Sequence, residues 1–199
     1  AVEATVNFHL EAKGLTASAA LSDGTNHRPH YSLRTLIRGL TFAMKLAPSY
    51  GLNRGLFEGM SMSSMAQLNR VSLERMQALI RQSFVRHLKD KQLCQAPTAP
   101  KSAEERFIKF EHFWLPLGPL TPDANAASRY IITPSIRHHL ARLARGTLSG
   151  NPMLLQGPTS VGKTSMVEYL AKVTGHRFVR VNNHEHTDIQ EYLGGYISD

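Results

Sequence analysis

Residues 157–164 read Gly157-Pro-Thr-Ser-Val-Gly-Lys-Thr164 and fit the phosphate-loop pattern of glycine, four residues, glycine, lysine, then serine or threonine. The flanking sequence supplies the context that this pattern needs. Met153-Leu-Leu-Gln156 predicts a short buried strand before the loop, and residues 165–174 carry apolar side chains at helical spacing after it. Gly175 follows where a helix C-terminal cap belongs. Strand, loop and helix in this order predict a phosphate-binding unit of the α/β class.

The expected ligands of this loop are a nucleotide phosphate and a magnesium ion. Backbone N–H groups from Ser160 to Ser165 can converge on an anion, because glycines leave the backbone accessible and a helix N-terminus carries partial positive charge. Lys163 would reach the β- and γ-phosphate oxygens, and the Thr164 hydroxyl would complete the Mg²⁺ shell. A glycine-rich turn without a ligand is the alternative, but it has no need of lysine followed by threonine. The predicted binding residues for ATP are Gly157, Pro158, Thr159, Ser160, Val161, Gly162, Lys163, Thr164 and Ser165, with Thr164 as the magnesium ligand.

Composition and charge restrict the classes of partner. The 199 residues are 42% hydrophobic, yet no run approaches the roughly 18 apolar residues of a membrane span, so we expect no membrane partner. The single cysteine, Cys94, excludes an intrachain disulfide. The net charge of +8 favours a polyanionic neighbour such as RNA, but no sequence-specific nucleic-acid motif is present. A solvated, basic helical surface is therefore the preferred interpretation.

Residues 1–90 predict an all-helical bundle of four helices. Gly14 is expected to end the first helix, and Ser32, Asn53 and Ser72 are expected to cap the next three. Arg34 lies opposite the apolar residues of the second helix, where a solvated basic face is the simple interpretation. The apolar residues at helical spacing in the four segments are Val2, Val6 and Leu10; Leu33, Leu36, Ile37, Leu40 and Met44; Leu56, Phe57, Met60 and Leu68; and Leu73, Met76, Ile80, Phe84 and Leu88.

Residues 91–129 predict a linker, within which the aromatic stretch 107–114 is expected to dock on a neighbouring domain as a strand or extended segment. Thr133 as N-cap and Pro134 at the first helical position then predict a helix. After the loop helix, residues 177–181 alternate polar and apolar side chains, as a strand does.

The polar stretch 182–188 follows this second predicted strand. Loops at the carboxyl ends of parallel strands lie beside the ligand, so Asp188 is a candidate for positioning water or reading the nucleotide state. The preferred alternative is that Thr187 or Asp188 caps a short helix that begins near Ile189. His184, Glu185 and His186 form no metal site of sufficient size, because no further ligands accompany them.

The chain resembles a junction between two AAA+ modules of the midasin family, very large dynein-related ATPases. Residues 130–135, 154–166 and 175–194 are similar to the start of one module, and the last stretch is the most diagnostic because many ATPases share the phosphate loop. Residues 1–90 resemble the helical lid of the preceding module. Residues 28–36 resemble its sensor-2 region, which implies that Arg34 lies near the γ-phosphate of the upstream nucleotide.

The resemblance implies an α/β fold class, with an all-helical AAA+ lid (1–90), a linker (91–129) and the N-terminal part of a P-loop AAA+ αβα core (130–199). It also implies a nuclear and nucleolar ATPase that remodels pre-ribosomal large-subunit particles and their assembly factors beside neighbouring AAA+ modules. The second acidic motif that holds Mg²⁺ is absent after Thr164, so we expect a fragment that does not turn over ATP by itself. A MoxR-type chaperone ATPase and a non-hydrolysing structural module of an AAA+ ring are the alternatives.

Overall fold

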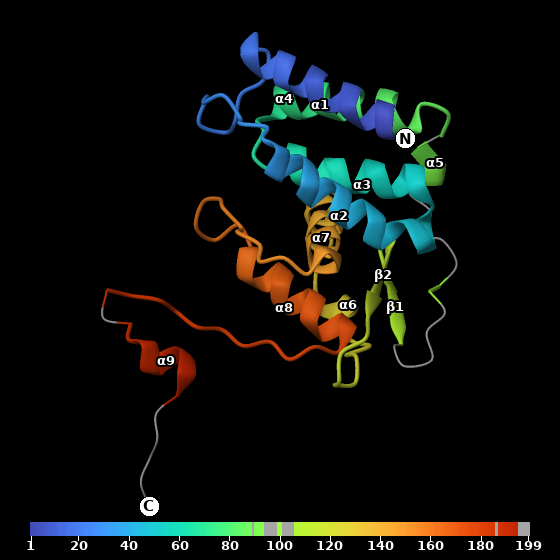
Figure 1. Cartoon of the computed structure of the whole chain (residues 1–199). Coiled ribbons are helices and arrows are strands. Elements are labelled where there is room, and N and C mark those ends of the chain that lie inside the picture. The colour runs from blue at the N-terminus through green and yellow to red at the C-terminus, as the bar shows by residue number, and fades with distance from the viewer. Residues whose placement is uncertain (89, 94–98, 101–105, 186, 195–199) are drawn as a thin grey trace, which may run out of the picture.

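A computed structural model describes residues 1–88, 90–93, 99–100, 106–185 and 187–194 of the chain. A helical bundle formed by the N-terminal part lies on one side, and a hairpin with three further helices lies on the other (Figure 1). Among the described helices, none combines the length and the apolar character that a membrane crossing requires. Of the predicted linker, 91–129, residues 94–98 and 101–105 lie outside the described residues.

The bundle confirms the helical prediction for the N-terminal part, and α3 is its central element. Residues 54–61 of α3 are all buried, and α2 and α4 pack against this helix. The core of the bundle includes Phe8, Met60, Met76 and Ile80. The elements are α1 (Val2–Ala17), α2 (Leu33–Tyr50), α3 (Leu52–Met65), α4 (Arg70–Ile80), the π-helical turn η1 (Arg81–Val85) and α5 (Asp90–Leu93).

The helix ends agree with the prediction at Ser32 and differ at three other positions. Ser32 caps α2 by accepting a hydrogen bond from the Thr35 amide, as expected. Helix α3 follows Gly51 directly, so Asn53 lies inside it. Asn69 is the N-cap of α4, because its side chain accepts from the amide of Ser72 at 2.9 Å and thereby satisfies a free N–H of the first turn.

Helix α1 differs from its prediction in both its end and its buried face. It continues through Gly14 to Ala17. The predicted apolar residues at positions 2, 6 and 10 are exposed, whereas Phe8 and Ala12 are buried against the rest of the bundle. The bulky ring of Phe8, which packs 5.3 Å from the ring of Phe84, decides which face turns inward.

The second part begins with a β-hairpin, which includes the aromatic stretch that was predicted as a strand or extended segment. Strands β1 (Phe107–Phe110) and β2 (Phe113–Pro116) pair antiparallel around Glu111 and His112. Phe113 and Leu115 are 1% exposed and pack with residues of α7 (Pro134–Ser149) and α8 (Lys163–Thr174). The short helix α6 (Ala126–Arg129) packs on α8.

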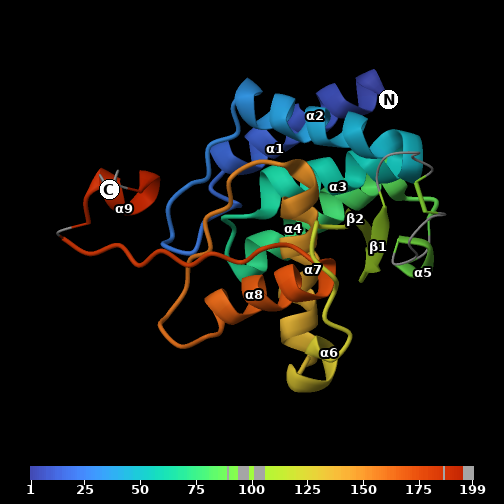
Figure 2. The ribbon, with the colours of Figure 1, turned by 90° about the horizontal axis from the view of Figure 1, so that it is seen from below.

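Helix α7 begins as predicted. The Thr133 hydroxyl accepts from the Ile136 amide at 3.3 Å, with Pro134 in the first turn. Leu140 and Leu143 are buried. Helix α7 lies between the bundle and α8, because it contacts both α3 and α8 (Figure 2).

Both strands predicted around the phosphate loop are absent. Residues 151–158 and 176–184 contain no strand, and Leu154 is 91% exposed. A strand needs a hydrogen-bonded neighbour, and neither segment has one among the described residues. The described residues of 130–199 therefore do not show the expected αβα core. The segment after α8 runs outward to α9 (Ile189–Leu193), which lies apart from the other helices in both views (Figures 1 and 2).

Candidate functional site

The predicted phosphate loop joins the end of α7 to the start of α8. Gly150 ends α7 in the left-handed conformation, with φ 74°, and releases the chain into an exposed segment. Gly162 precedes α8 with φ 82°, a conformation that glycine adopts without the penalty of a Cβ atom. The loop therefore reaches the N-terminus of a helix of 12 residues, where a partial positive charge is available for an anion.

The backbone N–H groups of this helix start have no acceptor from the protein. Among the described residues, no hydrogen bond runs from the amides of 160–165 to any protein group, and the first bond of the turn is Met166 N–H to Gly162 O at 3.0 Å. The first N–H groups of any helix lack an intrahelical partner. None of residues 160–165 is buried, so these N–H groups remain available to a ligand.

Lys163 is held inside the loop. Its ammonium group donates to the carbonyl oxygens of Gly157 at 2.8 Å and Pro158 at 2.5 Å. These contacts place the positive charge over the loop, and the Thr164 side chain beside it is exposed. The two side chains and the free amides are the donor set that a phosphate with a bound Mg²⁺ requires, so the residues present fit such a ligand.

Helix α8 carries the loop on an apolar base. Leu170 is 6% exposed, and Met166, Val167 and Val173 pack beside it, as the helical spacing predicts. Tyr169 stacks on Tyr130 with ring centroids 4.5 Å apart. A hollow of about 130 Å³ next to this pair, which Ser165 also lines, is smaller than the roughly 300 Å³ of ligand pockets.

The other predicted site residues lie away from the loop or have local roles. Arg34 is exposed in the first turn of α2. Asp188 is the N-cap of α9 and accepts from the Ile189 amide at 2.6 Å, which favours the capping interpretation over catalysis. Thr187 accepts from the His184 amide at 2.7 Å. No group of three metal-ligating side chains occurs in the described part of the chain, and His186 lies outside it.

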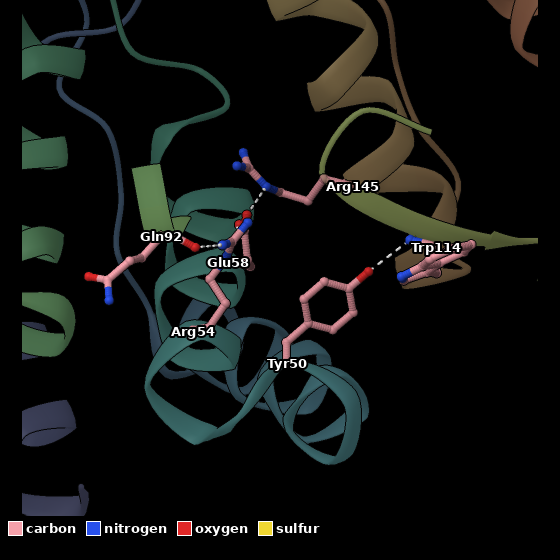
Figure 3. A network of polar contacts seen from close by, with 6 residues as sticks. All are labelled: Tyr50, Arg54, Glu58, Gln92, Trp114 and Arg145. Carbon is pink, nitrogen blue, oxygen red and sulfur yellow. Dashed lines mark hydrogen bonds and ion pairs between the residues drawn. The ribbon is translucent and has the colours of Figure 1, made fainter. Parts of the chain in front are cut away.

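One buried polar network was not found by sequence reasoning. Glu58 of α3 is 2% exposed and binds Arg54 on its own helix and Arg145 on α7 (Figure 3). The sequence contains a signal for one half of it, because Arg54 and Glu58 stand four residues apart. The contact with Arg145 spans 87 residues and depends on the packing of α7.

Comparisons with known proteins place the chain in a family. Residues 1–87 match the family described as the midasin AAA lid domain. Over its whole length the chain is 46% identical to a midasin of Dictyostelium discoideum, and over 86% of its length it is 32% identical to a midasin of Giardia intestinalis. The chain spans about 4% of the length of each of these relatives. No solved structure matches. Whole-length similarity to one midasin, together with the lid match, shows that the chain belongs to the midasin family of AAA+ proteins.

Proposed function

We propose that residues 157–165 bind the phosphates of ATP with Mg²⁺, and that the N-terminal bundle is the lid over the nucleotide of the preceding AAA+ module. The observation that carries the first half is the group of amides of residues 160–165 at the start of α8, none of which has a protein acceptor among the described residues. Membership of an AAA+ family supports nucleotide binding in general.

The loop residues have separate roles in this proposal. The amides of 160–165 surround the phosphate oxygens, and Gly162 keeps the space above them free of a side chain. The Lys163 ammonium exchanges its two carbonyl contacts for phosphate oxygens. The Thr164 hydroxyl would hold Mg²⁺, which neutralises charge on the β- and γ-phosphates when it is bound.

The proposal extends to the intact protein. We expect it to hydrolyse ATP and to use the energy to remodel pre-ribosomal large-subunit particles and release their assembly factors in the nucleus and nucleolus. The chain would contribute the phosphate-binding half of one site. Its Arg34, in the first turn of α2, would act as sensor for the nucleotide held upstream. Family membership supports this wider function.

Titration calorimetry with ATP and Mg²⁺ tests the site in the 199-residue chain. We expect Lys163→Ala to weaken binding at least about tenfold, because a charge-assisted contact to phosphate is lost. Lys172→Ala is the matched control, since this exposed lysine lies on the same helix and pairs with Glu168. Equal affinity of the wild type and Lys163→Ala would remove Lys163 from any phosphate contact and overturn the proposal.

A further inference from the structure

The two parts of the molecule have separate apolar cores. One cluster of buried residues runs from Phe8 to Leu93 and lies within the lid and α5. The other is built on Phe113, Leu143 and Leu170 of the hairpin, α7 and α8. Among the described residues, Tyr50 is the lid residue that packs against this second core. Phe42 and Leu46 of α2 are also buried and belong to neither cluster.

A buried carboxylate occupies the junction. Each oxygen of Glu58 accepts from a different arginine: Oε1 from Arg54 Nε at 2.6 Å, and Oε2 from Arg145 Nε at 2.6 Å (Figure 3). The first arginine belongs to the lid and the second to α7. The side chain of Arg145 is 20% exposed, so the bond across the junction is well shielded from water.

Other directional contacts surround this carboxylate. The Arg145 guanidinium lies 5.9 Å from the centre of the Phe113 ring. The Trp114 amide of β2 donates to the Tyr50 hydroxyl at 2.8 Å, so the end of α2 is tied to the hairpin. Arg142, one turn before Arg145 on α7, donates to the Ala66 carbonyl just after α3 at 3.4 Å.

The charge balance makes Glu58 the critical member. Arg142 and Arg145 lie one turn apart on α7, and burial together with the charge of Arg145 lowers the pKa of Arg142. Without a carboxylate between the two helices, Arg54 and Arg145 would face each other as like charges. Removal of one member of a buried ion pair leaves an uncompensated charge, which is far more destabilising than loss of an exposed pair.

We propose that Glu58 is a clamp that couples the lid to α7, so that the lid and the body of hairpin, α7 and α8 keep one relative orientation and move together. Hydrophobic contact is non-directional, whereas the two arginine bonds of Glu58 fix both distance and angle. The clamp links the lid to the helix that leads into the phosphate loop. It acts whether or not that loop binds a nucleotide.

The distance between spin labels on the two parts tests this coupling. Lys13→Cys on α1 and Lys172→Cys on α8 place labels at exposed sites, in a Cys94→Ser background. Double electron–electron resonance should give a narrow distance distribution. Arg145→Gln cuts the bond across the junction and leaves the Arg54–Glu58 pair of α3 in place. We expect the distribution to become at least about twice as broad while circular dichroism keeps the helical signal.

Three further variants complete the test. Arg137→Gln is the control, because this exposed arginine of the same helix pairs with Glu111 outside the junction, and its distribution should stay narrow. Glu58→Gln should broaden the distribution as Arg145→Gln does. The double variant Glu58→Gln/Arg145→Gln should have a distribution hardly broader than that of either single variant, because the two side chains act as one unit. An unchanged, narrow distribution in Arg145→Gln would overturn the proposal, and so would equal broadening in Arg137→Gln.

Discussion

Gly175 ends α8 at a point where two backbones nearly touch. Its φ is +69°, and a Cβ atom there would lie 2.2 Å from the carbonyl oxygen of Leu120. Gly150 ends α7 with φ +74°, but its Cβ would meet nothing closer than 3.8 Å. We expect Gly150→Ala to lower the free energy of unfolding by about 1–2 kcal/mol, the cost of a left-handed alanine.

Gly175→Ala should cost about 1–3 kcal/mol more than Gly150→Ala, because the contact with Leu120 adds overpacking to the same backbone strain. Urea denaturation of both variants measures the difference. Equal decreases in the free energy of unfolding would mean that the segment around Leu120 moves away from the added methyl group at no cost.

Ionisation of Tyr31 is expected to make the lid less stable at alkaline pH. Its side chain is 7% exposed and donates to the Ser64 carbonyl at 2.8 Å, and burial raises the pKa of Tyr31 from 10.0 to about 12. The folded state holds this proton more tightly than the unfolded state. The contribution of the protonated Tyr31 to the free energy of unfolding is therefore complete below pH 10 and is lost as the pH rises toward 12.

Thermal unfolding from pH 8 to pH 12 checks this sign. Tyr31→Phe should be less stable than the wild type at pH 8, because the hydrogen bond to Ser64 is lost, by about 0.5–1.5 kcal/mol. The difference should shrink above pH 10, since the wild type alone must then keep a buried phenol protonated. A difference in stability between the two proteins that stays constant from pH 8 to pH 12 would show that Tyr31 does not contribute to the loss of stability at alkaline pH.

At the scale of elements, α2 and α3 pack through glycine. A Cβ atom on Gly59 would lie 2.2 Å from the Gly39 carbonyl oxygen, and one on Gly55 would lie 2.6 Å from the Ala43 carbonyl oxygen. Gly59→Ala should therefore force the helices apart and lower the free energy of unfolding by about 1–3 kcal/mol.

Gly14→Ala is the matched control for this helix pair. Position 14 is an exposed site within α1 with no atom near the added methyl group. Alanine there should stabilise the chain by about 0.5–1 kcal/mol through helix propensity. If Gly59→Ala were also stabilising, the close approach of α2 and α3 would not be a feature of the folded protein.

This glycine contact also explains why the inward face of α2 was predicted only in part. Leu36 and Leu40 pack against the core as the pattern predicted, whereas Leu33, Ile37 and Met44 are 68%, 60% and 72% exposed. Helix α2 instead turns Gly39 and Ala43 toward α3, because small residues allow the backbones to approach. A prediction from the hydrophobic pattern assigns large apolar residues to the buried face. It cannot detect a contact in which glycine and alanine bring two backbones close together. Helix α4 lacks such a contact at its core face, and there the predicted Met76 and Ile80 are fully buried.

The sequence predicted the helix that follows the phosphate loop correctly, but it did not predict the conformation of the segments on either side of the loop and this helix. The glycine, lysine and helix start of residues 162–174 depend on local conformation, and the helix was predicted correctly. The strands expected at 153–156 and 177–181 depend on pairing with other strands, so a local pattern could not establish them. The Glu58 clamp depends on packing between distant segments and was missed for the same reason.

At the scale of the whole molecule, the chain should bind a nucleotide without consuming it. ATP hydrolysis in AAA+ sites needs acidic groups that hold Mg²⁺ and polarise water, besides the loop lysine. Asp188, the acidic candidate of the second part, caps α9, and α9 lies apart from α8 (Figure 1). We therefore expect the loop to supply binding but not the activation of water.

Phosphate release by the 199-residue chain measures this directly. We expect the rate with ATP and Mg²⁺ to equal that of Lys163→Ala and of a sample without protein, under conditions in which calorimetry detects binding to the wild type. Asp188→Asn should leave the rate unchanged, because Asn still caps a helix N-terminus and no catalytic carboxylate is lost. Turnover that disappears in Asp188→Asn but not in Lys172→Ala would instead make this carboxylate catalytic, and α9 would then have to approach the loop during the reaction.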